Sequence, residues 1–180
     1  MLTEEQVIAQ TKKWIGEVVI GCNFCPFAAP VVKQNRVHYS VSFNTLTSLC
    51  LNDFSEEITR LDNNPSIETS LLIFPEAFRR FSEYLDAVTL AEKLLKKNGY
   101  EGIYQVASFH PAYYFAGSKP DDAANYTNRS PYPMLHLLRE ESITKALEHF
   151  PEPENIPLRN VQFAREKGPV YMKMLRDSCL

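Results

Sequence analysis

The sequence predicts an α/β protein built on a small, mostly parallel β-sheet that is flanked by helices. Strand patterns at residues 37–43, 70–74 and 103–109 alternate with helical patterns at 45–61 and 81–97. Each connection is long enough to contain a crossover helix, so this β-α-β-α-β order favours neighbouring parallel strands. An α+β ferredoxin-like arrangement is the alternative.

Length and composition favour one domain over residues 1–180. The chain is 44% hydrophobic and 12% aromatic, which supplies enough apolar surface for one core. Its formal net charge is -3. A surface that binds duplex nucleic acid needs a dense basic face, so we expect no duplex partner.

The amino terminus, the short apolar runs and the cysteines favour a soluble cytoplasmic protein. The amino terminus is acidic and then amphipathic, without the basic start and apolar stretch of a secretory signal. No apolar run approaches the roughly 20 residues that cross a bilayer, so we expect no membrane-spanning segment. Four cysteines are sparse for this length, which favours reduced thiols.

Local signals set the bounds of the expected elements. Thr3 and Gln6 match a capping box at the start of a first helix, and Gly21 is a natural stop for it. Residues 37–43 alternate apolar and polar side chains, as in a strand with one buried face. Residues 71–74 are continuously apolar, which indicates a strand covered on both faces. A helical tail is expected to run to Met174.

An irregular segment at residues 111–129 leads into an expected helix that begins near Ser130. Long loops in compact domains usually bind something, and the aromatic residues of this one argue against disorder. Ser130 is a good N-cap, and Pro131 fits the first helical position. Helical spacing then places His136 and Glu140 on one face.

The expected helix start suggests a site for a small anionic ligand. Free backbone donors at a helix start, together with Asn128, Arg129 and Ser130, form a candidate phosphate or carboxylate site. Arg139 is a further candidate ligand-binding residue. The alternative is that Ser130 only caps the helix and that Arg129 pairs with an aspartate of the preceding loop.

His110 and His136 are candidate catalytic residues. His110 follows the third expected strand, at the edge where open α/β sheets hold ligands. Either histidine could carry a proton or bind a metal. The competing interpretation of His136 is a core histidine satisfied by a backbone carbonyl or by Glu140.

Cys25 is the third catalytic candidate. Cys22 and Cys25 have the spacing of a redox dithiol or of half a zinc site, but no second pair exists. Both follow the carboxyl end of the first helix, where the helix dipole disfavours a thiolate. A divalent metal would remove that penalty, so Cys25, His110, His136 and Glu140 form a candidate mixed metal site. Cys25 could equally be a small buried hydrophobe.

Four strings in the chain are distinctive: Cys25-Pro26-Phe27-Ala28, residues 104–111 (YQVASFHP), residues 125–140 (NYTNRSPYPMLHLLRE) and residues 156–160 (IPLRN). They resemble a bacterial family of about this length that is catalogued as a domain of unknown function. The resemblance spans nearly the whole chain and implies a bacterial cytosolic protein. It also implies that Cys25 is a better candidate than Cys22, whose position is often apolar in that family.

Two classes of function fit these residues. The first is an enzyme that acts on a small anionic substrate, with arginine holding charge and histidine moving protons. The second is a non-catalytic module that binds a ligand or a partner. Both hypotheses assume that Cys25, His110, Arg129 and His136 surround one hollow.

Overall fold

The computed structural model describes residues 2–148 and 150–180, and within these residues four strands form one mixed sheet in the order β1-β2-β4-β3. β1 and β2 pair in parallel, whereas β4 pairs antiparallel with both β2 and β3. β1, β2 and β3 therefore run in one direction and β4 runs in the other. The strands are β1 (Val37–Val41), β2 (Thr69–Ile73), β3 (Tyr104–Phe109) and β4 (Met134–Arg139).

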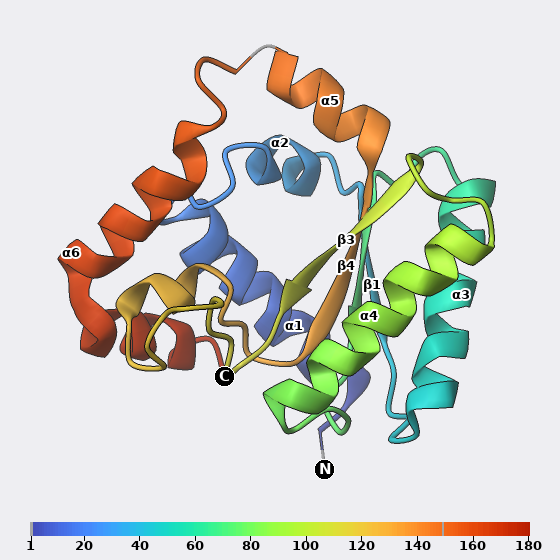
Figure 1. Ribbon diagram of the computed structural model, residues 1–180, viewed down its shortest axis with the longest axis horizontal. Helices are drawn as coiled ribbons and strands as arrows, with labels where there is room; N and C mark the ends of the chain where they lie inside the picture. Colours follow the sequence, from blue (N-terminus) through green and yellow to red (C-terminus); the bar gives the residue numbers. More distant parts are fainter. Residues whose placement is uncertain (1, 149) are drawn as a thin grey trace.

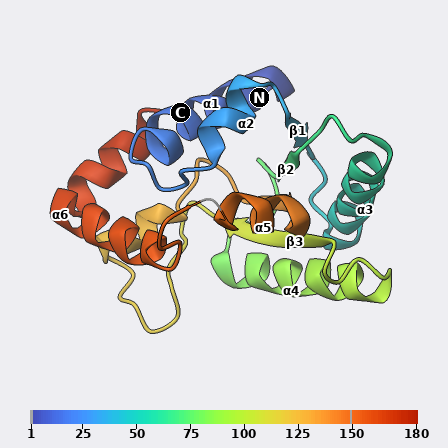
Figure 2. The ribbon, with the colours of Figure 1, turned by 90° about the horizontal axis from the view of Figure 1, so that it is seen from above.

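Helices cover both faces of the sheet (Figure 1). One face carries α3 (Thr47–Asn63) and α4 (Phe81–Lys97). The other carries α1 (Glu4–Trp14), its continuation as the π-helical turn η1 (Ile15–Ile20), and α2 (Ala28–Lys33). α5 (Glu140–Glu148) follows β4 directly. Figure 2 shows α4 and the α1-α2 pair on opposite sides of the sheet. α6 (Asn155–Asp177) lies at one side of these layers, on the left in that view.

Most of the expected elements are confirmed. The β-α-β-α-β order is present as β1-α3-β2-α4-β3, and the Thr3 capping box is formed. The sheet, however, is mixed rather than mostly parallel, because β4 lies between β2 and β3. This strand order does not confirm the ferredoxin-like alternative.

The prediction of a helix that begins near Ser130 is wrong. Residues 134–139 form β4, and a helix begins only at Glu140. β4 is central, with His136 opposite Leu71 of β2 and Ala107 of β3. Hydrogen bonds on both edges of the segment thus override its local helix signals. Ser130 is fully buried and donates its hydroxyl hydrogen to the Tyr132 carbonyl at 2.5 Å, so it caps no helix.

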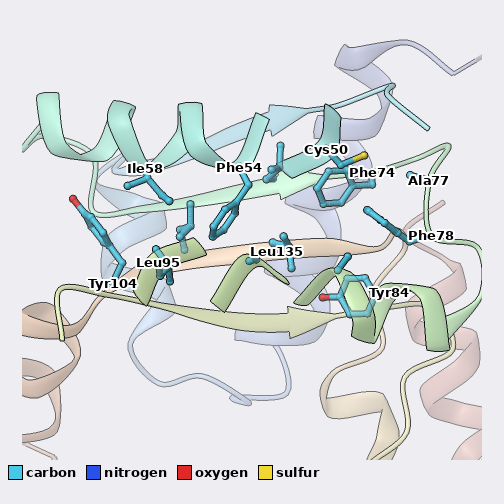
Figure 3. Packing of buried hydrophobic residues seen from close by; sticks show 14 of the residues in the cluster. Cys50, Phe54, Ile58, Phe74, Ala77, Phe78, Tyr84, Leu95, Tyr104 and Leu135 are labelled. Carbon is cyan, nitrogen blue, oxygen red and sulfur yellow. The ribbon is translucent and has the colours of Figure 1, made fainter. Parts of the chain in front are cut away.

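The layer between the sheet and α3 and α4 is filled by a dense apolar cluster (Figure 3). Side chains of a strand alternate between its two faces, so Leu135 and Leu137 of β4 point into this layer. Tyr84 of α4 donates its hydroxyl hydrogen to the Met134 carbonyl at 2.7 Å and accepts from the Phe109 backbone N–H at 3.0 Å. These bonds fix α4 against the ends of β3 and β4.

The opposite face of the sheet packs against α1, η1 and α6. Trp14 and Val18 lie in this cluster with Leu71, Ile73 and Met134 of the strands. The segment between β3 and β4, which contains the 3-10 turn η2 (Ala123–Thr127), is tied to α6 by the ion pair of Asp122 with Arg165, at 2.7 Å. α6 bends at Gly168, whose φ of 80° is readily adopted by glycine. Of the helices in the described part of the chain, none is long and apolar enough to cross a membrane.

Candidate functional site

A cavity of about 550 Å³ lies between the sheet and the helices α1, η1, α2 and α5. Its volume is in the range of small-molecule sites. Most of the lining is apolar. The sheet contributes Val37, Thr69, Leu71, Gln105, Ala107, Phe109, His136, Leu138 and Arg139, and the helices and loops contribute Trp14, Ile15, Val19, Cys25, Pro26, Phe27, Ala28, Pro30, Val31, Val32, Glu68, Ser142, Ile143 and Ala146.

Alternation along the strands produces this lining. Leu71, Ala107 and His136 stand side by side on neighbouring strands and face the same way. The methyl group of Ala107 leaves room next to the imidazole of His136. The opposite wall follows from the end of the first helix, where η1 brings Ile15 and Val19 to the cavity.

His136 is the central polar group of the cavity. Its Nε2 lies 2.6 Å from the hydroxyl oxygen of Thr69, and the same oxygen lies 2.5 Å from the Leu137 carbonyl oxygen. A carbonyl cannot donate, so the Thr69 hydrogen points at Leu137. The Thr69 oxygen must therefore accept from Nε2–H, which leaves Nδ1 as the unprotonated nitrogen.

Burial lowers the pKa of His136 to about 4, so the ring is neutral at neutral pH. Nδ1 makes none of the hydrogen bonds found in the described residues, and the ring is only partly buried because the cavity reaches it. His136 thus presents a hydrogen-bond acceptor to a mostly apolar space.

Trp14, at the end of α1, lines the cavity opposite the sheet. The residue is 1% exposed, and its indole N–H has no partner among the described residues. A buried donor without an acceptor is costly and uncommon. Its ring packs edge-on against Phe109, with centroids 5.3 Å apart. Trp14 is the single tryptophan of the chain, so its fluorescence reports on this cavity.

Cys25 also lines the cavity, in the turn between η1 and α2. The thiol lies near the backbone N–H groups of Phe27 and Ala28, which stabilise a thiolate, but burial has the larger effect and raises the pKa of Cys25. α2, which begins just after this thiol at Ala28, was not expected from the sequence. Cys25 and His136 share the cavity, although neither carries the charge of an activated thiolate-imidazolium pair.

One end of the cavity is polar. Glu68, Gln105, Arg139 and Ser142 cluster there, where β2 and β3 begin and β4 ends. α5 covers this side with Ser142, Ile143 and Ala146, and none of its described residues is fully buried. The ring of Phe150 packs edge-on against Phe27 at 5.3 Å, which ties the segment after α5 to the turn before α2.

His110 lies away from the cavity, on the α4 side of the sheet. It is 1% exposed, its Nε2 lies 2.8 Å from the Phe78 carbonyl, and its Nδ1 accepts from the Ala112 N–H at 2.9 Å. Burial lowers the pKa of His110. Both ring nitrogens are thus used within the fold, and they hold the start of the following loop against α4.

Asn128, Arg129 and Ser130 are also occupied within the fold. Arg129 donates to the carbonyls of Tyr113 and Pro120 and stacks over the ring of Tyr126. Asn128 donates to the Ser108 carbonyl at 3.1 Å. Because no helix begins at Ser130, the expected anion site at a helix start does not form.

Arg139 and Glu140 belong to the junction of β4 and α5. The Arg139 guanidinium donates to the carbonyls of Leu61, Asn64 and Ile67 and to the Tyr104 hydroxyl. It thereby closes the end of α3. Glu140 lies on the other side of this junction, where its backbone N–H donates to the Ile103 carbonyl at 3.0 Å.

The expected metal ligands do not come together. Cys25 and His136 line the cavity, whereas His110 is bonded on the opposite face of the sheet. Within residues 2–148 and 150–180, no group of three or more histidine, cysteine, aspartate or glutamate side chains is arranged to hold a metal ion. The assumption of one hollow around Cys25, His110, Arg129 and His136 is therefore wrong.

A smaller polar hollow of about 330 Å³ near the end of β1 was not anticipated. The carboxylate of Glu57 is 2% exposed there and accepts from Ser70 at 2.5 Å, from Arg60 at 3.1 Å and from His38 at 2.9 Å. Burial alone would raise the pKa of Glu57, but these bonds lower it to about 2. The polar residues of β1 and a glutamate on the apolar face of α3 were the available signals.

A family model matches residues 6–174, and its description is "Protein of unknown function (DUF1415)". The chain belongs to this family. The resemblance inferred from the sequence strings is thus confirmed. Comparisons with curated proteins and with solved structures find no match. The family carries no activity in its description, so function is argued from the cavity.

Proposed function

We propose that this member of the DUF1415 family is a non-catalytic module that binds a small, mostly apolar molecule in the cavity beneath α5. The observation that carries the proposal is the 550 Å³ hollow, whose apolar walls surround the neutral imidazole of His136. Sites for small molecules typically combine apolar walls with a few placed polar groups.

Catalysis has less support than binding. A histidine whose pKa is about 4 is a weak base at neutral pH, and a thiol whose pKa is raised is a weak nucleophile. An enzyme for an anionic substrate would need free basic groups in its site. Arg129 donates instead to the Tyr113 carbonyl, and Arg139 donates to the Leu61 carbonyl. A bacterial cytoplasmic location is part of the proposal, supported by four free cysteines and by the family resemblance.

Trp14 fluorescence tests the proposal directly. Titration with n-octanol is expected to change the Trp14 emission with saturation, because the ring forms part of the cavity wall. Ala107→Phe and Ala146→Phe each place a phenyl ring in the cavity. They are expected to weaken octanol binding at least about tenfold, because a filled cavity cannot accept the alkyl chain of octanol.

Ala9→Phe is the matched control, because Ala9 is exposed on α1. This variant is expected to bind like the wild type. An emission that does not saturate, or equal affinity in the cavity-filling variants and the control, would contradict the proposal.

A further inference from the structure

The cavity presents an acceptor that the fold leaves without a donor. The Thr69 hydroxyl donates a hydrogen bond to the Leu137 carbonyl and accepts one from Nε2–H of His136. Nδ1 of the neutral His136 ring is therefore unprotonated. The two short contacts fix this tautomer, since rotating the Thr69 hydrogen toward Nε2 would leave two oxygens facing each other at 2.5 Å. An acceptor in an apolar space is stabilised by a donor from a bound molecule.

Trp14 has a donor without an acceptor among the described residues. The indole N–H of Trp14 is buried and unpartnered among the described residues, and its ring lines the cavity with His136. Because this nitrogen has almost no accessible surface, a molecule in the cavity does not reach it. A ligand hydroxyl therefore serves His136, to which it can donate its single hydrogen.

Charged ligands fit the cavity less well. A carboxylate has no hydrogen to offer Nδ1, and the basic residue of the described lining, Arg139, already donates from all three guanidinium nitrogens. An ammonium group would need a carboxylate, but Glu68 is paired with Arg36 at 2.8 Å. Burying either charge without a partner is costly.

We propose that the cavity selects neutral apolar molecules that carry a hydroxyl group, with the ligand O–H donating to Nδ1 of His136. The inference rests on the proposed binding function and names its ligand class. Aliphatic and aromatic alcohols have this chemistry, whereas ethers of the same size accept a hydrogen bond but cannot donate one.

The test compares n-octanol with its isomer heptyl methyl ether and with octanoate, each titrated against wild-type protein at neutral pH by Trp14 fluorescence. A net hydrogen bond is worth about 0.5–1.5 kcal/mol, so the alcohol is expected to bind about 2–10 times more tightly than the ether. Octanoate is expected to bind more weakly than both. The two compounds have the same atoms and nearly the same size, so the ratio compares a ligand that can donate a hydrogen bond with one that cannot.

Two variants assign the preference to His136. His136→Phe removes the acceptor. Thr69→Val removes the partner of Nε2–H, so the proton of the imidazole is no longer held on Nε2. The alcohol-to-ether ratio is expected to fall to about one in the first variant and to decrease in the second. Cys25→Ala alters another part of the cavity lining, makes no change to His136 or Thr69, and is expected to keep the wild-type ratio.

The outcomes separate the two proposals. Equal binding of alcohol and ether by the wild type would overturn the hydroxyl inference and leave the binding function intact. Absence of binding by all three compounds would overturn both. An unchanged alcohol-to-ether ratio in the folded His136→Phe variant would contradict the inference. Loss of the ratio in Cys25→Ala would also contradict it, because the ligand hydroxyl would then contact a group other than His136. The wild-type comparison decides the inference even if a variant fails to fold.

Discussion

His136 owes its chemistry to its position in the middle of β4. On a helix, as first expected, its ring would have shared a face with Glu140. On a central strand it lies between Leu71 and Ala107 and bonds to Thr69 of the adjacent strand. The resulting loss of solvent lowers its pKa and keeps one nitrogen free toward the cavity.

The lowered pKa of His136 predicts an acid dependence of stability. Between the ordinary pKa of 6.5 and the folded value of about 4, the unfolded chain binds a proton that the folded protein does not. This residue's contribution therefore lowers the free energy of unfolding as pH falls through that window, by about 2 kcal/mol at about pH 5.

Urea unfolding of the wild type and of His136→Phe at neutral pH and at about pH 5 measures this effect. The variant is expected to lose less stability on acidification than the wild type. His110, whose pKa is also lowered, is present in both proteins, so its contribution cancels in the difference. Parallel losses in the two proteins would show that His136 is not kept neutral by the fold.

At the scale of the elements, the order of helices and strands was largely predictable, because α3, α4 and the first three strands follow local periodicity. β4 was not, because its conformation depends on hydrogen bonds to β2 and β3, which are distant in sequence. The sequence drew attention to His136, which lines the cavity, but not to its partner Thr69, since only the antiparallel register places the two together. No local pattern reports a cavity, which is set by side chains that leave space unfilled.

Arg139 joins three elements, so its removal is expected to lower stability more than the loss of a surface arginine. Arg139→Met removes the charged donor from the carbonyls at the end of α3 and from the Tyr104 hydroxyl. Bonds to a charged donor predict a loss of about 2–3 kcal/mol in the free energy of unfolding. Arg79→Met is the matched control, because the Arg79 side chain is 82% exposed and its ion pair should contribute at most about 1 kcal/mol.

Denaturant unfolding of the two arginine variants gives the comparison. Both variants replace arginine by methionine, so the difference between their losses in the free energy of unfolding reports on the Arg139 contacts. Equal losses in Arg139→Met and Arg79→Met would mean that the Arg139 contacts add nothing to the stability of the β4-α5 junction.

Across the whole molecule, the two faces of the sheet differ in packing. The α3-α4 side is filled by buried side chains such as Phe54, Leu72 and Leu135, whereas the α1-α2 side contains the cavity. A dense layer on one face holds the strands in place, which fixes the spacing of His136, Thr69 and Leu71 on the other. The central claim is that this second face receives a small molecule.

Methyl-resolved NMR with added n-octanol tests that claim most directly. The account predicts saturable shifts of methyl groups that line the cavity, namely those of Ile15, Val19, Leu71 and Ile143. Methyl groups of the opposite layer, such as those of Ile58, Leu72 and Leu95, are expected to stay unchanged. Shifts spread equally over both layers, or no saturable shift at all, would contradict it.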